Sequence, residues 1–409
     1  MNAIFQTLLL KTLSRLSRGS LELRLPTGRI HRFGGLGKDL SVRLDVEDNA
    51  FFRRSVLGGP IGFAESYMAG EWTTPDLTRL LAWFILNGDD ALETPERRTR
   101  GWLLNVYNRW LHSRRHNSVT SSRRNIGDHY DLSNEFFQLW LDSTMTYSSA
   151  YFDPPTLSLE EAQIEKYDQL CRKLQLKAGD HVLEIGSGWG GFSLHASRKY
   201  GCRITTVTIS EQQYREASAR IAAAGLQDRI DIRMEDYRHI QGSFDKIVSI
   251  EMLEAVGDAY VDGYFAKCQE LLKPRGLLGL QAILCPDQQY PILRDGVDFI
   301  QKHIFPGSLL MSVGRIGEAM RHGTAFTMLD YDDMGPYYAK TLKLWRDNFE
   351  AKLDAVRALG FDETFIRKWR YYLCYCEAAF ATRHITVAQL IYTRPDNIAI
   401  HSPAYDLFS

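Results

Sequence analysis

Apolar and polar positions alternate through the middle of the chain with the periods of strands and helices. Val182, Leu183 and Ile185 form a short apolar run that is typical of a buried parallel strand, and a glycine-rich turn follows at once. Similar runs predict further strands over 203–207, 229–233, 244–250 and 276–284. Helical periods between them predict helices over 160–176, 192–200, 211–224 and 258–272. This order favours an α/β fold with a mostly parallel sheet and right-handed connections.

The two ends of the chain follow other patterns. Residues 1–18 place leucines on one helical face and basic side chains on the other, so this helix lies either on a membrane surface or on its own domain. Short strands with glycine turns and a following helix complete a small N-terminal α+β domain. Long aromatic-rich helices over 334–353 and 362–381 precede a last strand over 385–392. They predict a helical lid, at about 287–381, over the carboxyl edge of the sheet, where ligands of such folds bind.

Residues 97–124 differ in composition from both of their neighbours. They contain eight arginines and no acidic residue, with tryptophan, tyrosine and leucine interleaved. Arginine beside tryptophan and tyrosine suits an anionic lipid interface, while nucleic-acid binding and a solvated linker are the competing interpretations. Because the net charge of the chain is only −1, electrostatic targeting must be local. We therefore divide the chain into an N-terminal accessory domain (1–96), an arginine-rich linker (97–124) and an α/β domain that includes the lid (125–409).

Cysteine usage and hydropathy bear on the compartment. The six cysteines are scattered and form no C-x-x-C pair, which indicates reduced thiols and no zinc or other metal site. No apolar run in the sequence approaches the ~20 residues of a membrane span, and no signal-peptide cleavage site is visible near the N-terminus. We expect a cytoplasmic protein that is peripheral at the inner membrane surface.

The glycine-rich turn indicates a nucleotide-type cofactor. Gly186, Gly188 and Gly191 satisfy the dinucleotide pattern G-x-G-x-x-G, which is weak by itself. A dinucleotide site also needs an acid at the end of the second strand, where this chain has Thr208. Asp236 follows the third strand instead, where it can accept a hydrogen bond from an adenine amino group. These residues favour S-adenosylmethionine over NAD, and a turn that only packs a helix on a strand is the remaining interpretation.

Six motifs occur in the order of a known family: HYDLSNEFFQLWLDSTMTYSSAYF, VLEIGSGWGGF, VTISEQQ, EMLEAVG, FIQKHIFPG and GPYYAKTLKLW. They resemble the motifs of the cyclopropane-fatty-acyl-phospholipid synthases and the related mycolic acid methyltransferases. The segment GFAESYMAGEWTTPDL resembles the extra domain of the phospholipid-acting members. The resemblance implies a Rossmann-like S-adenosylmethionine-dependent methyltransferase sheet with a helical lid insertion. It also implies cofactor contacts at Tyr147, Ser148, Gly186, Gly188, Thr208, Gln213 and Asp236.

The chemistry of this family assigns the catalytic residues. An isolated double bond is a poor nucleophile, and its attack on a sulfonium methyl leaves a carbocation that must lose a proton before a ring closes. The resemblance implies bicarbonate as the base, held by Glu254, Tyr338 and the backbone N–H groups of Ser149 and Ile283. Gln281 stands where the best-known synthases have histidine, and it carries no titratable proton near neutral pH. Ser149 replaces a cysteine, which costs little if only its backbone N–H is used.

We therefore expect methyl transfer from S-adenosylmethionine to the double bond of an unsaturated acyl chain in a membrane phospholipid, giving a cyclopropane fatty acyl chain. The expected partners are phospholipid acyl chains and an anionic membrane surface, not nucleic acid; the oligomeric state stays open, with a homodimer as one option. Gln281 keeps a methyl-branched or methylene product as an alternative. Two further functions stay open: a small-molecule amine N-methyltransferase and a non-catalytic lipid-binding protein.

Overall fold

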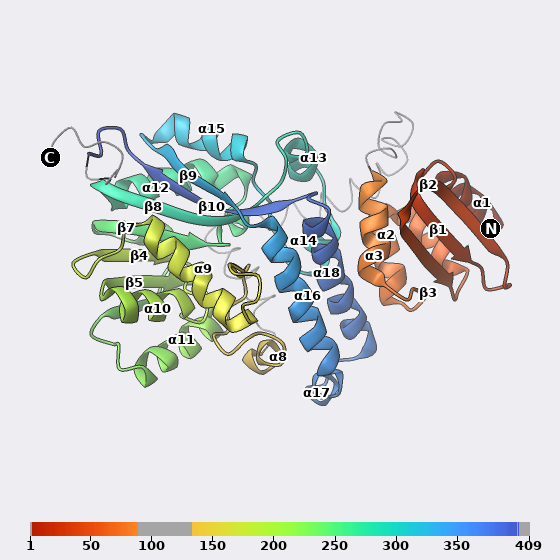
Figure 1. The fold of residues 1–409 in the computed structure, drawn as a ribbon, viewed down its shortest axis with the longest axis horizontal. Coiled ribbons are helices and arrows are strands. Elements are labelled where there is room, and N and C mark those ends of the chain that lie inside the picture. Colours follow the sequence, from red (N-terminus) through yellow and green to blue (C-terminus); the bar gives the residue numbers. More distant parts are fainter. Residues whose placement is uncertain (1, 89–132, 399, 401–409) are drawn as a thin grey trace. The chain divides into compact units, whose positions relative to one another are not determined.

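The structure, a computed structural model, describes residues 2–88, 133–398 and 400 (Figure 1). It contains two compact units. The first comprises Met1–Arg115, Pro291–Pro306 and Tyr338–Ile385, and the second comprises His116–Tyr290, Gly307–Tyr337 and Thr386–Ser409. Several of the predicted lid helices therefore belong to the same unit as the N-terminal residues. The predicted domain boundaries, and the place of the lid over the sheet, stay predictions.

A seven-stranded sheet forms the second unit, with the strand order β6-β5-β4-β7-β8-β10-β9. The bounds are β4 His181–Ile185, β5 Arg203–Thr208, β6 Ile230–Met234, β7 Phe244–Ile250, β8 Leu272–Leu284, β9 Thr327–Asp333 and β10 Thr386–Thr393. All pairs from β6 to β8 are parallel, while β10 is antiparallel to both β8 and β9. Parallel neighbours need the crossover helices that the sequence pattern places between them, so the predicted α/β sheet is confirmed.

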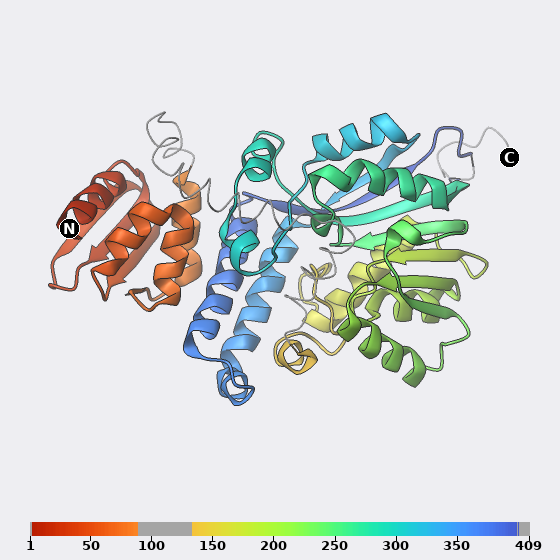
Figure 2. The ribbon, with the colours of Figure 1, turned by 180° about the vertical axis from the view of Figure 1, so that it is seen from behind.

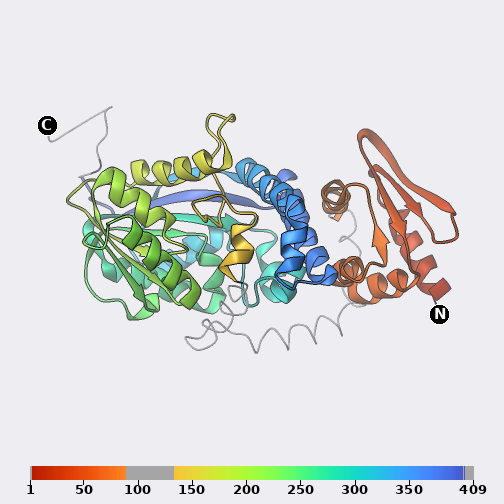
Figure 3. The same ribbon diagram turned by 90° about the horizontal axis from the view of Figure 1, so that it is seen from below.

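Helices cover both faces of this sheet. Their bounds are α8 Asn134–Gln138, α9 Leu159–Lys173, α10 Gly191–Tyr200, α11 Glu211–Ala223, α12 Val261–Leu271 and α15 Val313–Gly323. Figure 1 shows α9 in front of the sheet, and Figure 2, seen from behind, shows α12 and α15 in front of it. The view from below agrees, with α9 and α15 on opposite sides of β10 (Figure 3).

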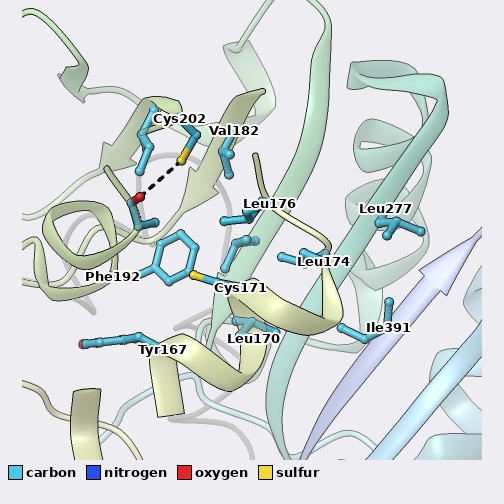
Figure 4. Packing of buried hydrophobic residues seen from close by; sticks show 13 residues of the cluster. Tyr167, Leu170, Cys171, Leu174, Leu176, Val182, Phe192, Cys202, Leu277 and Ile391 are labelled. Atoms are coloured by element: carbon cyan, nitrogen blue, oxygen red, sulfur yellow. Dashed lines mark hydrogen bonds between the residues drawn. The ribbon is translucent and has the colours of Figure 1, made fainter. Parts of the chain in front are cut away.

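The core beneath α9 joins elements that are far apart in the sequence (Figure 4). Leu170 of α9 and Leu174, which directly follows that helix, cluster with Val182 of β4, Phe192 of α10 and Ile391 of β10, and all five are buried. Burial of one such side chain stabilises the fold by ~1.5–3 kcal/mol, so the cluster fixes α9 firmly against the strands. The same packing holds the polar residues Gln163 and Lys166 of α9 in place.

The sequence pattern predicted only helices over the region that contains β9. In the sheet, β9 is the edge strand and pairs with β10 alone. Met328, Leu329 and Tyr331 are 44%, 44% and 42% exposed, because an edge strand in this position has no buried face to fill. A strand without a buried face shows no alternation of apolar and polar residues, which is why the prediction missed it.

The first unit begins with a three-stranded sheet and its helices. The bounds are α1 Asn2–Leu13, β1 Arg18–Arg24, β2 Ile30–Val46, α2 Ala50–Met68, β3 Trp72–Thr73 and α3 Leu77–Leu86. Helix α1 is shorter than predicted, because Arg18 already begins β1. Leu13, the last residue of α1, is 4% exposed, and Leu16, just beyond the helix, is 6% exposed. This segment therefore packs within its own unit. That packing supports the placement of the N-terminal helix on its own domain.

Helices from the C-terminal half complete the first unit. Their bounds are α13 Tyr290–Asp295, α14 Phe299–His303, α16 Gly335–Ala351, α17 Leu353–Ala358 and α18 Glu363–Ala381; Tyr290 of α13 and residues 335–337 of α16 belong to the second unit. Arg367 of α18 donates to the carbonyl oxygens of Tyr67 and Trp72 at 2.5 and 2.9 Å. Glu65 of α2 accepts from Lys302 and His303 at 2.7 and 3.0 Å. Among the described residues, no helix has both the length and the apolar character needed to cross a membrane.

Candidate active site

The glycine-rich turn after β4 has the backbone conformation that only glycine adopts readily. Gly186, Gly188 and Gly190 have φ angles of 94°, 48° and 88°. A Cβ at Gly188 would meet no heavy atom of the described residues within 4 Å, so the turn borders open space. A Cβ at Gly186 would lie 3.1 Å from the Cγ of Met252, so the turn also touches the segment that follows β7.

Three more predicted cofactor residues follow the neighbouring strands. Thr208 ends β5 and donates from Oγ1 to Gln213 Oε1 at 2.9 Å. The Glu235 N–H donates to the Thr208 carbonyl at 3.0 Å, which brings Asp236 to the same edge. Asp236 is 2% exposed, and Arg238 donates to both of its carboxylate oxygens, at 2.8 and 2.7 Å. Burial acts to raise the pKa of Asp236, but the hydrogen bonds from Arg238 outweigh it and hold the pKa below its usual value.

The loop between α8 and α9 carries the predicted residues Tyr147 and Ser148. The Tyr147 ring packs edge-on against Trp140, with 5.4 Å between the centroids. The Ser148 hydroxyl accepts a hydrogen bond from Lys166 Nζ at 2.6 Å, and the Ser148 carbonyl accepts one from Gln163 Nε2 at 2.9 Å. Both donors come from α9, so the core beneath this helix also positions the loop.

Four of the five predicted catalytic residues lie together: Glu254 follows β7, Gln281 and Ile283 belong to β8, and Ser149 lies in the loop between α8 and α9. The Ile283 N–H donates to Oε1 of Glu254. Oε2 of Glu254 is buried and has no hydrogen-bond partner among the described residues. Burial, and then the charge on Glu251, raise the pKa of Glu254 to about 8. The Glu254 carboxyl group is therefore mostly protonated at neutral pH.

Glu251 joins the other two residues of this group. Its Oε1 accepts hydrogen bonds from the Ser149 N–H and from Gln281 Nε2, both at 2.8 Å. Its own N–H donates to the Gln281 carbonyl at 2.7 Å. Glu251 has a φ angle of 48°, which is uncommon for a residue other than glycine. Ser149 and Gln281 are thereby fixed around one carboxylate oxygen.

Tyr338, the fifth predicted catalytic residue, belongs to the first unit. It is 5% exposed, and its ring lies 4.5 Å from that of Phe380 and 6.0 Å from that of Trp345. Its predicted role beside Glu254 stays a prediction. The arginine-rich segment 97–124 and the start of the HYDLSNEFF motif lie outside the described residues.

A pocket of about 540 Å³ lies at the opposite end of the sheet, near the starts of β4, β7 and β8. Lys177, Lys246 and Lys273 are among the residues that line it. None of the predicted site residues does so. It is therefore separate from the site that the motifs indicate.

Comparison with known proteins identifies the family. The family model for mycolic acid cyclopropane synthetase matches residues 117–390. The chain belongs to this family. The tuberculostearic acid methyltransferase UfaA1 of Mycobacterium tuberculosis is 41% identical to it over 348 residues, which is 83% of this chain and 80% of that protein. The cyclopropane-fatty-acyl-phospholipid synthase of Escherichia coli strain K12 is 35% identical over 353 residues, which is 85% of this chain and 87% of that protein.

A solved structure of the family has the same fold. The mycolic acid cyclopropane synthase CmaA1, complexed with SAH and CTAB, superposes with a TM-score of 0.62 at 30% identity. The match covers 66% of this chain and 98% of that one. The family and the methyltransferase fold predicted from the motifs are confirmed, and the chain is a methyltransferase of the cyclopropane synthetase family.

Sequence reasoning missed several polar residues of the site. Glu251 lies inside the quoted motif EMLEAVG and directly after β7, so its place at a strand end was the available signal. Lys166 is fully buried, and this burial lowers its pKa to about 7 against the opposing charge of Glu251. Gln389 of β10 donates to the Lys166 carbonyl at 3.1 Å and to Gln281 Oε1 at 3.3 Å. No local pattern connects Gln389 to Lys166, because they become neighbours only when α9 packs against the sheet that contains β10.

Proposed function

We propose that this methyltransferase transfers a methyl group from S-adenosylmethionine to the double bond of an unsaturated phospholipid acyl chain and closes a cyclopropane ring. One observation carries the proposal: the glycine turn and the two carboxyl groups share one edge of the sheet. Gly186 lies against Met252, and Met252 lies between Glu251 and Glu254 in the chain. A methyl donor bound at the turn would therefore lie beside groups that can accept or hold a proton.

The residues around the turn suit S-adenosylmethionine. The open space at Gly188 lets a ligand approach the backbone closely, and Asp236 is a buried acceptor that suits an adenine amino group. When bound, the cofactor supplies an electrophilic sulfonium methyl group. The related CmaA1 is complexed with SAH, the demethylated form of this donor, which supports the same cofactor here.

The carboxyl groups suit an alkene substrate better than an amine. Methylation of an alkene leaves a carbocation, which buried negative charge stabilises strongly because the local dielectric constant is low. The cation must then lose a carbon-bound proton to a base. An amine attacks through its own lone pair and creates no such cation, so it has no need of a pair of carboxyl groups like Glu251 and Glu254. A protein that only bound lipid would need neither the pair nor the open glycine turn.

The choice of a phospholipid is supported by the Escherichia coli relative, which is named for that substrate and aligns with 85% of this chain. The arginines in 97–124 suit an anionic membrane surface. We propose on this basis that the enzyme works as a peripheral protein on the cytoplasmic side of the inner membrane.

A second product has support of its own. The Mycobacterium tuberculosis relative is named as a tuberculostearic acid methyltransferase, and tuberculostearic acid is methyl-branched. Gln281 also replaces the histidine of the best-known synthases. From the same cation, a hydride shift followed by loss of a methyl proton gives a methylene acyl chain, and loss of an acyl-chain proton gives a methyl-branched chain that keeps a double bond. A saturated methyl branch additionally needs a separate two-electron reductant.

The test is incubation of the purified protein with S-adenosylmethionine and vesicles of dioleoylphosphatidylglycerol. Vesicles of distearoylphosphatidylglycerol, which has no double bond, are the control. We expect each converted oleoyl chain to gain one CH2, and the control lipid to gain nothing. Proton NMR of the product then separates the high-field signals of a cyclopropane from the alkene signals of a methylene group. An absence of any gain in the dioleoyl lipid would contradict the proposal, and methylation of a small amine instead would support an amine N-methyltransferase.

A further inference from the structure

Glu251 and Glu254, with the groups that donate hydrogen bonds to them, form what we call the carboxylate cluster. The bicarbonate ion that the family resemblance implies does not fit this cluster. Three of the groups expected to hold it would be the Ser149 N–H, the Ile283 N–H and the Gln281 side chain. In the structure, Ser149 and Gln281 donate to Glu251 Oε1, and Ile283 donates to Glu254 Oε1. The chain's own carboxyl groups therefore use all three donors. A further anion would lose these hydrogen bonds and would also be repelled by the charge on Glu251.

We propose that the Glu251 carboxylate takes the place of the external anion and is the base that accepts the proton released after methyl transfer. This inference rests on the proposed methyl transfer to a double bond. Glu251 directly follows β7, and its neighbour Met252 touches the glycine turn. Its backbone N–H bond to Gln281 and its positive φ angle hold the side chain where Ser149 and Gln281 converge. This convergence is the position that the resemblance assigns to bicarbonate.

The two neighbouring carboxyl groups have different surroundings and therefore different roles. Glu251 receives two hydrogen bonds on one oxygen and lies close enough to the buried Lys166 to favour the charged form of that lysine. Glu254 has one backbone donor and a buried oxygen without a partner among the described residues. Two carboxyl groups that share a site rarely ionise together, so one serves as the base and the other holds a proton. Glu251 is the charged member, and Glu254 is the protonated one.

The proposed step balances in atoms and electrons. The π pair of the double bond forms the new carbon–carbon bond to the methyl group, and the sulfur–methyl bond breaks with its pair on sulfur. The other alkene carbon becomes the cation. A proton of the new methyl group moves to a Glu251 oxygen, and the carbon–hydrogen pair closes the three-membered ring at the cation. The carboxylic acid then gives this proton to water, which restores the base.

Two substitutions at Glu251 test the assignment. Glu251→Gln keeps the shape and removes the charge, while Glu251→Gly suits the φ angle of 48° and empties the position. We expect the wild-type rate to be the same in bicarbonate-free and bicarbonate-supplemented buffer. Glu251→Gln should lose ~10²–10³-fold in turnover and should retain cofactor binding in calorimetry. Glu251→Gly should regain turnover when bicarbonate is added, because the ion then fits. The exposed Glu318→Gln is the matched control and should behave as wild type.

Binding of the anion is measured separately from activity, by NMR titration with ¹³C-labelled bicarbonate. We expect saturable binding to Glu251→Gly and none to the wild type. Saturable binding to the wild type, a bicarbonate requirement of the wild-type reaction, or full turnover by Glu251→Gln would each overturn the inference. If the wild type excludes bicarbonate but methylates no lipid, the proposed function fails while the replacement of the anion by Glu251 stands.

Discussion

At the scale of single residues, Gly188 decides whether the cofactor can bind. Its φ angle is 48° and a Cβ there would extend into open space, so a side chain would strain the turn and fill the volume that the ligand needs. We expect Gly188→Val to abolish S-adenosylmethionine binding in calorimetry. Gly317→Val is the control, because Gly317 is exposed on α15 and a Cβ there also meets no described atom within 4 Å. Equal binding by both variants would remove the glycine turn from the cofactor site.

Glu254 makes the free energy of unfolding depend on pH. Its pKa is raised from the ordinary value to about 8, so the folded protein binds its proton more tightly than the unfolded chain does. The stability from this group is then fully present below about pH 4.5 and is lost as the pH rises towards about 8. We expect the unfolding free energy of the wild type to fall relative to Glu254→Gln by about 2–4 kcal/mol between these pH values. Denaturant unfolding at several pH values measures it, and a constant difference would contradict the buried, protonated state.

At the scale of elements, the sequence predicted what short-range patterns control. The apolar run of β4, the glycine turn and the crossover helices each show their period locally, and the structure confirms them. Strand β9 was missed because its residues face solvent at the sheet edge. The sequence predicted Glu254 of the carboxylate cluster but not Glu251. The hydrogen bonds from Ser149 and Gln281 to Glu251 span 102 and 30 residues along the chain. Such contacts follow from the order of strands, which a linear pattern does not contain.

Helices α2 and α14 are joined by a charge cluster that can be tested by itself. The hydrogen bond from His303, opposed by burial and aided by Lys302, lowers the pKa of Glu65 to about 2. The stability from this group is present above about pH 4.5 and is lost as the pH falls towards about 2. We expect Glu65→Gln to lower the unfolding free energy by ~1–3 kcal/mol at pH 7, and the loss to shrink in acid.

The control for this cluster is Asp354→Asn on α17, whose side chain is fully exposed. It should change the unfolding free energy by less than ~0.5 kcal/mol. Urea unfolding at pH 7 and at acidic pH values between about 4.5 and about 2 compares the two variants. A Glu65→Gln effect as small as that of Asp354→Asn would show that the ion pairs between α2 and α14 add nothing to stability.

At the scale of the whole molecule, the even balance of charge makes the arginine-rich segment stand out. The net charge is −1, yet residues 97–124 carry eight arginines and no acid. We expect binding to anionic vesicles that weakens with salt, since each basic residue near such a surface contributes ~1 kcal/mol. Substitution of Arg97, Arg98, Arg114 and Arg115 by glutamine should reduce the affinity severely in a sedimentation assay. The same change at the exposed Arg29, Arg53, Arg215 and Arg275 is the control. Equal partitioning to neutral and anionic vesicles at low and high salt would leave the segment as a linker.

Methyl transfer to a lipid double bond is tested most directly with a donor whose transferred methyl group carries three deuterons. The purified protein is incubated with this donor and dioleoylphosphatidylglycerol vesicles, and the intact lipid is analysed by mass spectrometry. Loss of a proton from the transferred methyl group predicts one added carbon with two deuterons in each converted chain. Unlabelled lipid would contradict the proposed function. Retention of all three deuterons would contradict ring closure, because the lost proton would then come from the acyl chain and leave a methyl branch.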